Sequence, residues 1–160
     1  MALFNVLPTH ALSGERRRKR YGLLDTLREY AREKLAARGD VEAVYGRQAA
    51  YYLALAEKAE PHLLKARQLA WLEHLDAEHD NLRSALRWLW DAGKVHDAAR
   101  LGGSLHWFWY LRGHAAEERA WLKQILKARG SAGRGAAWAK VFVWAGNAAS
   151  WDRRDAQAGR

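Results

Sequence analysis

The densest group of side chains that could do chemistry lies at residues 73–80, which read Glu-His-Leu-Asp-Ala-Glu-His-Asp. Paired imidazoles and carboxylates can hold a metal ion, but a zinc-binding helix needs its two histidines about four residues apart. His74 and His79 are five residues apart, which places them on different faces of a continuous helix. We therefore expect no metal and no cofactor here. We interpret the segment as a polar helix junction, at which Asp80 or Asn81 caps the helix that follows.

Other arrangements typical of enzymes are also missing from the sequence. The 160 residues include no cysteine and no Gly-x-x-x-x-Gly-Lys-Ser/Thr loop that could cradle nucleotide phosphates. No serine has a histidine and an acid at the spacing of a hydrolase nucleophile elbow. Two pairs of carboxylates, Glu117 with Glu118 and Asp152 with Asp155, stand in segments that we expect to be turns or surface, not a pocket that shifts pKa values. The sequence therefore predicts a protein that is not an enzyme.

The composition is that of a globular, positively charged chain. Apolar residues make up 49% of the sequence, charged residues 28%, and the formal net charge is +9. No apolar run approaches the ~18 residues of a membrane-spanning helix, and residues 1–9 lack the basic leader of a signal peptide. We therefore expect a cytoplasmic protein with no membrane partner. The charge alone would allow nucleic-acid binding, but most basic residues alternate with acidic ones.

The elements that must position these residues are helices. Apolar side chains recur at three- and four-residue spacing in the segments 23–35, 44–59, 64–75, 82–89, 95–111, 121–126 and 138–145. The chain has two prolines, and the apolar segments are mostly joined by short polar stretches. Because short connections place neighbouring helices antiparallel, the sequence predicts an all-α fold of stacked antiparallel helix hairpins. The last segment is expected to end in a turn at residues 152–155.

Four strings along the chain resemble one group of bacterial regulators. They are Tyr-Gly-Leu-Leu-Asp-Thr-Leu-Arg-Glu-Tyr-Ala-Arg-Glu-Lys-Leu at 21–35, Ala-Tyr-Tyr-Leu-Ala-Leu-Ala-Glu at 50–57, Glu-His-Asp-Asn-Leu-Arg-Ser-Ala-Leu-Arg-Trp at 78–88, and Trp-Phe-Trp-Tyr-Leu-Arg-Gly-His at 107–114. Together they resemble the helical, tetratricopeptide-like region of STAND-class ATPases and LuxR-type transcriptional regulators, starting at the end of the winged-helix domain. The resemblance implies that residues 15–21 correspond to the last wing strand. It also implies that the 78–88 motif holds the geometry of a helix hairpin.

The expected organisation has three parts. Residues 1–20 form an irregular segment, residues 21–93 a bundle of linking helices, and residues 94–160 tetratricopeptide-like hairpins, the last of them truncated. The resemblance implies a regulatory repeat region that contacts a partner, while the phosphate-binding loop of the family's ATPase domain is absent from this sequence.

Nine tryptophans are an unusual content for 160 residues. Most are expected in the core, since a helix in a stacked array has two buried faces. Some tryptophans do not fit one apolar stripe, and others belong to the truncated last hairpin. These could instead form an exposed aromatic surface for a partner or a second copy of the chain. The candidate residues of this surface are Trp88, Trp107, Trp109, Trp144 and Trp151.

The sequence thus predicts a non-catalytic helical interaction scaffold that binds a protein partner or itself. The alternative is a small basic nucleic-acid-binding module. Its candidate contacts are Arg16, Arg17, Arg18, Lys19 and Arg20, together with Lys140, Arg153 and Arg154. Nucleic-acid binding would weaken strongly with added salt, and association of the scaffold would depend on salt very little.

Overall fold

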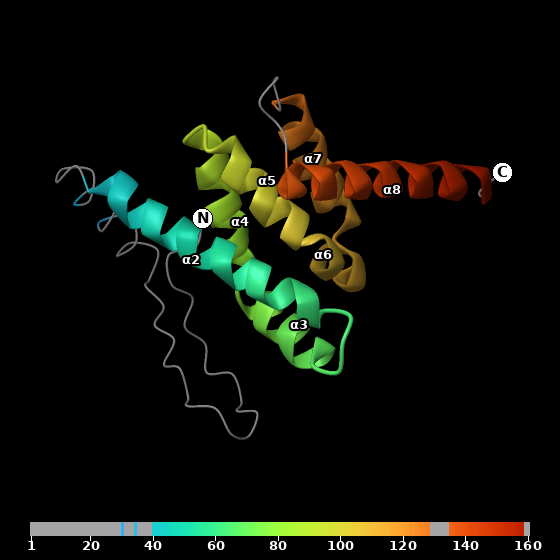
Figure 1. The fold of residues 1–160 in the computed structure, drawn as a ribbon, viewed down its shortest axis with the longest axis horizontal. Coiled ribbons are helices and arrows are strands. Elements are labelled where there is room, and N and C mark those ends of the chain that lie inside the picture. The colour runs from blue at the N-terminus through green and yellow to red at the C-terminus, as the bar shows by residue number, and fades with distance from the viewer. Residues whose placement is uncertain (1–29, 31–33, 35–39, 129–134, 159–160) are drawn as a thin grey trace.

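A computed structural model describes residues 30, 34, 40–128 and 135–158. Its helices are α2 (Val41–Ala59), the 3₁₀ helix η1 (Glu60–His62), α3 (Gln68–Ala77), α4 (His79–Asp91), α5 (Val95–Ser104), α6 (His106–Arg112), α7 (Ala115–Lys127) and α8 (Ala136–Ala158). The described residues contain helices and no strands, which confirms the predicted all-α fold (Figure 1). The irregular segment 1–20, the wing strand at 15–21 and the basic run from Arg16 to Arg20 lie outside the described residues.

Two helices end at glycines in the left-handed conformation, as their sequences predict. Gly93 follows α4 with φ +68°, and Gly113 follows α6 with φ +75°. In each case the next residue closes the helix end: Lys94 N donates to Leu89 O, and His114 N donates to Trp109 O, both at 2.8 Å. A side chain with a Cβ is strained in this conformation, so glycine fixes both turns.

Helix α5 lies at the centre of the described fold and contacts α2, α4, α7 and α8 (Figure 1). Its residues from Leu101 to Ser104 are all buried. The apolar stripe predicted for α4 is confirmed, because Leu82, Ala85, Leu86 and Leu89 are all buried. Burial of such a stripe, at about 25 cal/mol per Å² of apolar surface, is the main force holding α4 in place.

The predicted helix over 95–111 is divided in the structure. Helix α5 ends at Ser104 and α6 begins at His106. The break follows Gly102 and Gly103, which favour the helical conformation least among residues other than proline. These glycines also allow close packing: a Cβ on Gly103 would lie 3.3 Å from Lys140 Cβ on α8.

Helix α8 runs through residues 152–155, where the sequence predicted a turn, and continues to Ala158. The prediction of a turn was wrong because residues 152–158 contain neither glycine nor proline, and arginine, alanine and glutamine favour the helix. The helix packs against α5 and α7, and its C-terminal part extends past the other helices (Figure 1). Lys140 Nζ lies 2.6 Å from Glu60 Oε2 of η1, which ties α8 to the start of the fold.

The predicted inner face of α2 is only partly right. Ala59 and Leu55 are buried as expected, but Tyr51 is 49% exposed. The buried face also includes Ala49, Leu53 and Ala56, because α2 packs against both α4 and α5. Leu64, predicted to face inward ahead of α3, is 57% exposed.

None of the helices within the described ranges is long and apolar enough to cross a membrane.

Candidate functional site

Three of the four strings that carry the family resemblance meet at one polar junction. Glu78 lies between α3 and α4, and its Oε2 accepts hydrogen bonds from Tyr52 Oη of α2 at 3.0 Å and from Asn81 Nδ2 at 2.7 Å. His79, the next residue, contacts His114 at the α6–α7 turn, with ring centroids 4.4 Å apart. The break between α3 and α4 at Glu78 therefore forms the polar helix junction that the sequence predicted. The predicted cap is wrong, because the N-cap residue of α4 is Glu78 and both Asp80 and Asn81 lie in the first turn.

Four side chains form the second half of this junction, which we call the His79 cluster: His79, Arg83, His114 and Glu117. The Arg83 guanidinium donates from Nε to Glu117 Oε1 at 2.9 Å and from Nη2 to Oε2 at 2.6 Å. His79 Nε2 lies 3.3 Å from Glu117 Oε2. The edge of the buried Phe108 ring packs against His79, with centroids 5.0 Å apart, and closes the cluster on its inner side.

Each member of the cluster is positioned by a helix start. His79 begins α4, and Arg83 lies one turn further along the same helix. His114 is the N-cap residue of α7, and Glu117 lies three residues later, in its first turn. Residues three apart on a helix point to the same side, so His114 and Glu117 face α4 together.

The surroundings of the cluster lower the pKa values of both Glu117 and His114. Burial alone would raise the pKa of Glu117, but interactions with His79 and Arg83 outweigh it and lower the pKa to about 2. The pKa of His114 is lowered, first by burial and then by the neighbouring positive charge of His79. Near neutral pH, Glu117 is therefore a carboxylate and His114 a neutral imidazole.

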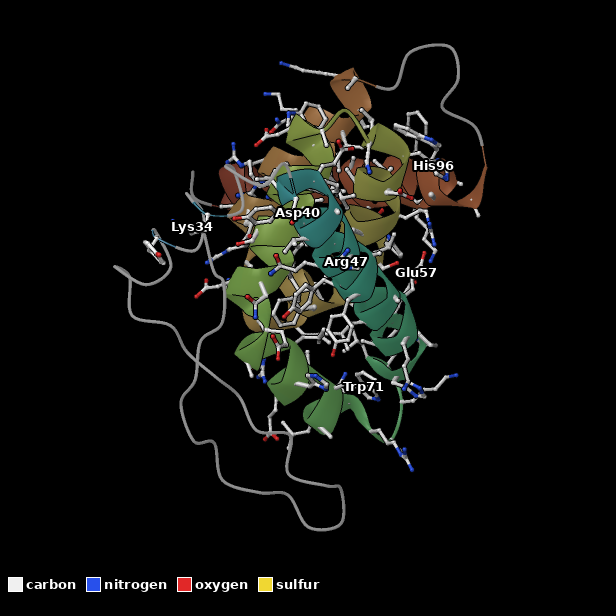
Figure 2. All side chains as sticks on the ribbon, turned by 90° about the vertical axis from the view of Figure 1, so that its left-hand side faces the viewer. Lys34, Asp40, Arg47, Glu57, Trp71 and His96 are labelled. Carbon is white, nitrogen blue, oxygen red and sulfur yellow. The ribbon has the colours of Figure 1, made fainter. Side chains whose placement is uncertain are left out.

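This cluster was not predicted from the sequence, because His114 and Glu117 lie far from His79 along the chain. His74 does not approach His79; its ring stacks on Trp71, with centroids 5.8 Å apart. Trp71 lies beside the C-terminal end of α2, where His62 stacks on its ring at 5.3 Å (Figure 2). The local signal that could have found the cluster is the spacing of His114 and Glu117, which places both side chains on one face of a helix.

The expectation that Glu117 and Glu118 stand on the surface was wrong. The Glu117 side chain is 17% exposed, and Glu118 is 2% exposed. Glu118 pairs with Nδ1 of His106, itself 2% exposed. The His106 ring also stacks on Trp144 of α8, with centroids 3.8 Å apart. A buried carboxylate thus links α7 to α6 and, through the imidazole, to α8.

The predicted aromatic surface stays a prediction, because Trp88, Trp107 and Trp144 are only half-buried and pack against the core. Trp107 and Trp144 are half-buried, with ring centroids 5.5 Å apart, and Tyr110 lies beside Trp107 at 5.9 Å. The prediction of an exposed ring is wrong for Trp109, which is 1% exposed, because the helix that begins at His106 turns this residue toward the core. Trp151 lies in α8, beyond the side chains that the structure describes. We call Trp107, Tyr110 and Trp144 the α6–α8 aromatic surface.

Trp88 belongs to a different place, a groove of about 350 Å³ between α2, α4 and α5. Lys94 lies over its ring, 4.7 Å from the centroid. The charged side chains of the groove pair with each other: Arg100 donates to both oxygens of Glu57, at 2.9 and 3.0 Å, and to Asp97 at 3.0 Å.

Comparison with known proteins relates this fold to transcriptional regulators. Curated relatives from two strains of Mycobacterium tuberculosis and from Mycobacterium bovis carry the name "Putative HTH-type transcriptional regulator". Each is 36% identical to this chain over 110 residues, which are 69% of the chain and 12% of the relative. The chain thus spans about an eighth of the length of the curated relatives it matches, and it is similar to one segment of them.

No family model matches the chain, and no solved structure matches it.

Proposed function

We propose that this chain is a non-catalytic helical interaction segment of a transcriptional regulator, and that it associates with a second copy of itself through the α6–α8 aromatic surface. The similarity to HTH-type regulators supports the regulator context. The proposal includes a tetratricopeptide-like arrangement of the α5–α8 helices, as in the STAND-class and LuxR-type proteins that the sequence resembles, and a cytoplasmic location.

The observation that carries the proposal is the gathering of aromatic rings on α6 and α8. Tyr110 is 47% exposed, and Trp107 and Trp144 are half-buried beside it. Tyrosine and tryptophan dominate the energetically important positions of protein interfaces, because they bury a large area and lose little conformational entropy. A helix pair that presents such rings is suited to pack against another helix pair.

The charged groups of the fold support a structural role over catalysis. In the groove beside Trp88, the carboxylate of Glu57 is held by Arg100, and the carboxylate of Asp97 is held by the same guanidinium. The carboxylate of Glu118 is buried against His106. Groups that pair with each other in this way hold helices together, and a general acid or base would instead need access to a substrate.

Size-exclusion chromatography with light scattering tests the proposal, over a range of protein concentrations and from 50 to 500 mM salt. We expect association that depends on protein concentration and changes little with salt. Tyr110→Ala should weaken this association at least about fivefold, since loss of an interface aromatic typically costs more than 1 kcal/mol.

The matched control is Tyr51→Ala, which removes a tyrosine of similar exposure, 49%, from α2. This control should associate as the unchanged protein does. A monomer at all concentrations, or equal weakening by both substitutions, would contradict the proposal.

Duplex DNA in the same experiment tests the alternative of a basic nucleic-acid-binding module. Binding that is strong at 50 mM salt and lost at 500 mM would favour that alternative. Lys140, one of its candidate contacts, is already paired with Glu60 in the fold.

A further inference from the structure

We propose that His79, His114 and Glu117 form a binding site for a divalent transition-metal ion of the zinc class. The site lies at the junction of α4 with the α6–α7 turn, apart from the α6–α8 aromatic surface. It does not depend on the proposed self-association.

The geometry brings three ligand atoms together. One ring nitrogen of each histidine and one carboxylate oxygen of Glu117 lie within 4.8 Å of one another. Zinc binds imidazole nitrogen and carboxylate oxygen at about 2.0–2.2 Å. Small rotations of the three side chains would therefore bring these atoms onto one ion.

His79 is one of five residues in the described part of the chain that have a buried side-chain nitrogen or oxygen without a hydrogen bond. Its Nε2 atom is buried and makes no hydrogen bond of good geometry among the described residues, although Glu117 Oε2 is 3.3 Å away. A buried polar atom without a hydrogen bond costs free energy. Coordination of a metal ion by this nitrogen would remove that cost.

The donor set selects the class of metal. Two imidazole nitrogens and one carboxylate oxygen are typical of zinc and neighbouring transition metals, whereas magnesium and calcium prefer oxygen ligands throughout. Three protein ligands leave a fourth position for water or for a group from a partner. All three residues are half-buried, so the ion has a route to solvent.

Arg83 has two opposite effects on metal binding at this site. Its hydrogen bonds to Glu117 fix the carboxylate, as outer groups commonly do for metal ligands, but its positive charge repels a cation. Other charges balance it nearby: Asp80 lies 3.4 Å from Arg83. On the α3 side, Arg112 pairs with Asp76 at 2.5 Å.

Isothermal titration of the metal-free full chain with zinc chloride at pH 7.5 tests the proposal. We expect one saturable site, and no comparable binding of magnesium chloride. His114→Gln and Glu117→Gln should each weaken zinc binding at least about tenfold, because each removes one of the three ligands of the ion. His96→Gln is the matched control, since His96 is an exposed histidine on α5, and it should bind zinc as the unchanged protein does.

A further variant separates a metal site from a cluster that only stabilises the fold. Arg83→Gln keeps a donor for Glu117 and removes the opposing charge, so it should bind zinc severalfold more tightly while the metal-free protein loses stability. Circular dichroism of each metal-free variant establishes that it is folded before titration. Absence of one-site binding would overturn the proposal. So would equal affinity in the unchanged protein and both ligand variants, or weaker zinc binding by Arg83→Gln.

Discussion

Arg83 on α4 clamps Glu117 on α7 through two parallel hydrogen bonds, of 2.9 and 2.6 Å, across 34 residues of sequence. A guanidinium and a carboxylate matched in this way fix orientation as well as distance. The clamp therefore holds the first turn of α7 against α4, beside the histidines that complete the cluster.

Glu117→Gln should reduce the loss of stability in acid. The pKa of Glu117 in the folded protein is about 2, below its ordinary value of 4.5. The unfolded chain therefore binds the proton first, so the stabilisation is present above pH 4.5 and is lost as the pH falls through 2. We expect it to remain below about 3.4 kcal/mol, the value that the full change in pKa would give, because solvent screens the pair: the Arg83 side chain is 48% exposed.

Urea unfolding followed by circular dichroism between pH 2 and pH 7 measures this effect. Asp91→Asn, which changes an exposed carboxylate at the end of α4, should keep the acid dependence of the unchanged protein. The same pH profile for Glu117→Gln and the unchanged protein would contradict the assignment.

His114→Gln should flatten the pH dependence of stability at a higher pH. The pKa of His114 is lowered from 6.5 by burial and by the charge of His79. Folding favours the neutral form of His114. The contribution of this residue to the stability of the fold is therefore present above pH 6.5 and is lost as the pH falls through the lowered pKa. Melting temperatures from pH 7.5 to pH 5, in a metal chelator, should fall in the unchanged protein and in His96→Gln, and fall less in His114→Gln.

Glu118→Ala should destabilise the fold by roughly 3–5 kcal/mol, because it leaves His106 buried without its partner. Glu118→Gln keeps a hydrogen-bonding group and should cost less, about 1–2 kcal/mol. Urea unfolding followed by tryptophan fluorescence measures both, since Trp144 stacks on the His106 ring. Glu73→Ala, at an exposed position of α3, serves as the control. A cost for Glu118→Ala no larger than that of the control would show that the buried pair is dispensable.

Gly103→Ala and Gly146→Ala should have opposite effects. A Cβ at Gly103 would lie 3.3 Å from Lys140 Cβ and push α8 from α5, whereas a Cβ at Gly146 meets nothing within 4 Å among the described residues. We expect Gly146→Ala to stabilise by about 0.5–1 kcal/mol, since alanine favours the helix. Gly103→Ala should destabilise by about 1 kcal/mol, the cost of overcrowding exceeding the same gain. Thermal unfolding compares the two, and stabilisation by both would mean that α5 and α8 are not closely packed.

The sequence predicted well those parts of the fold that depend on neighbouring residues. The apolar stripe of α4 and the glycine stops after α4 and α6 are local patterns, and the structure confirms them. The break at Leu105 and the buried face of α2 were not predicted. The apolar periodicity continues through Gly102 and Gly103, although glycine favours the helix little, and the buried face of α2 is set by its packing against both α4 and α5.

In the candidate sites, too, the features set by neighbouring residues were predictable and those set by distant helices were not. The composition of residues 73–80 predicted a polar helix junction. It could not predict the partners of His79, because they come from α7. Trp109 could not be distinguished from Trp107 until the start of α6 was known, since one residue along a helix turns a side chain by about 100°. The carboxylates of Glu117 and Glu118 looked alike in sequence, yet each has its own buried or half-buried partner.

The contact between Lys140 and Glu60 joins residues 80 apart in the sequence. It closes a long loop that contains α3 to α7, and closing such a loop carries an entropy cost that grows only slowly with its length. A chain cut between these residues would carry the two charges on separate fragments. Reassembly of the two fragments would then be a bimolecular association. That association would have to position α8 against the rest of the fold, which the intact chain does within one molecule.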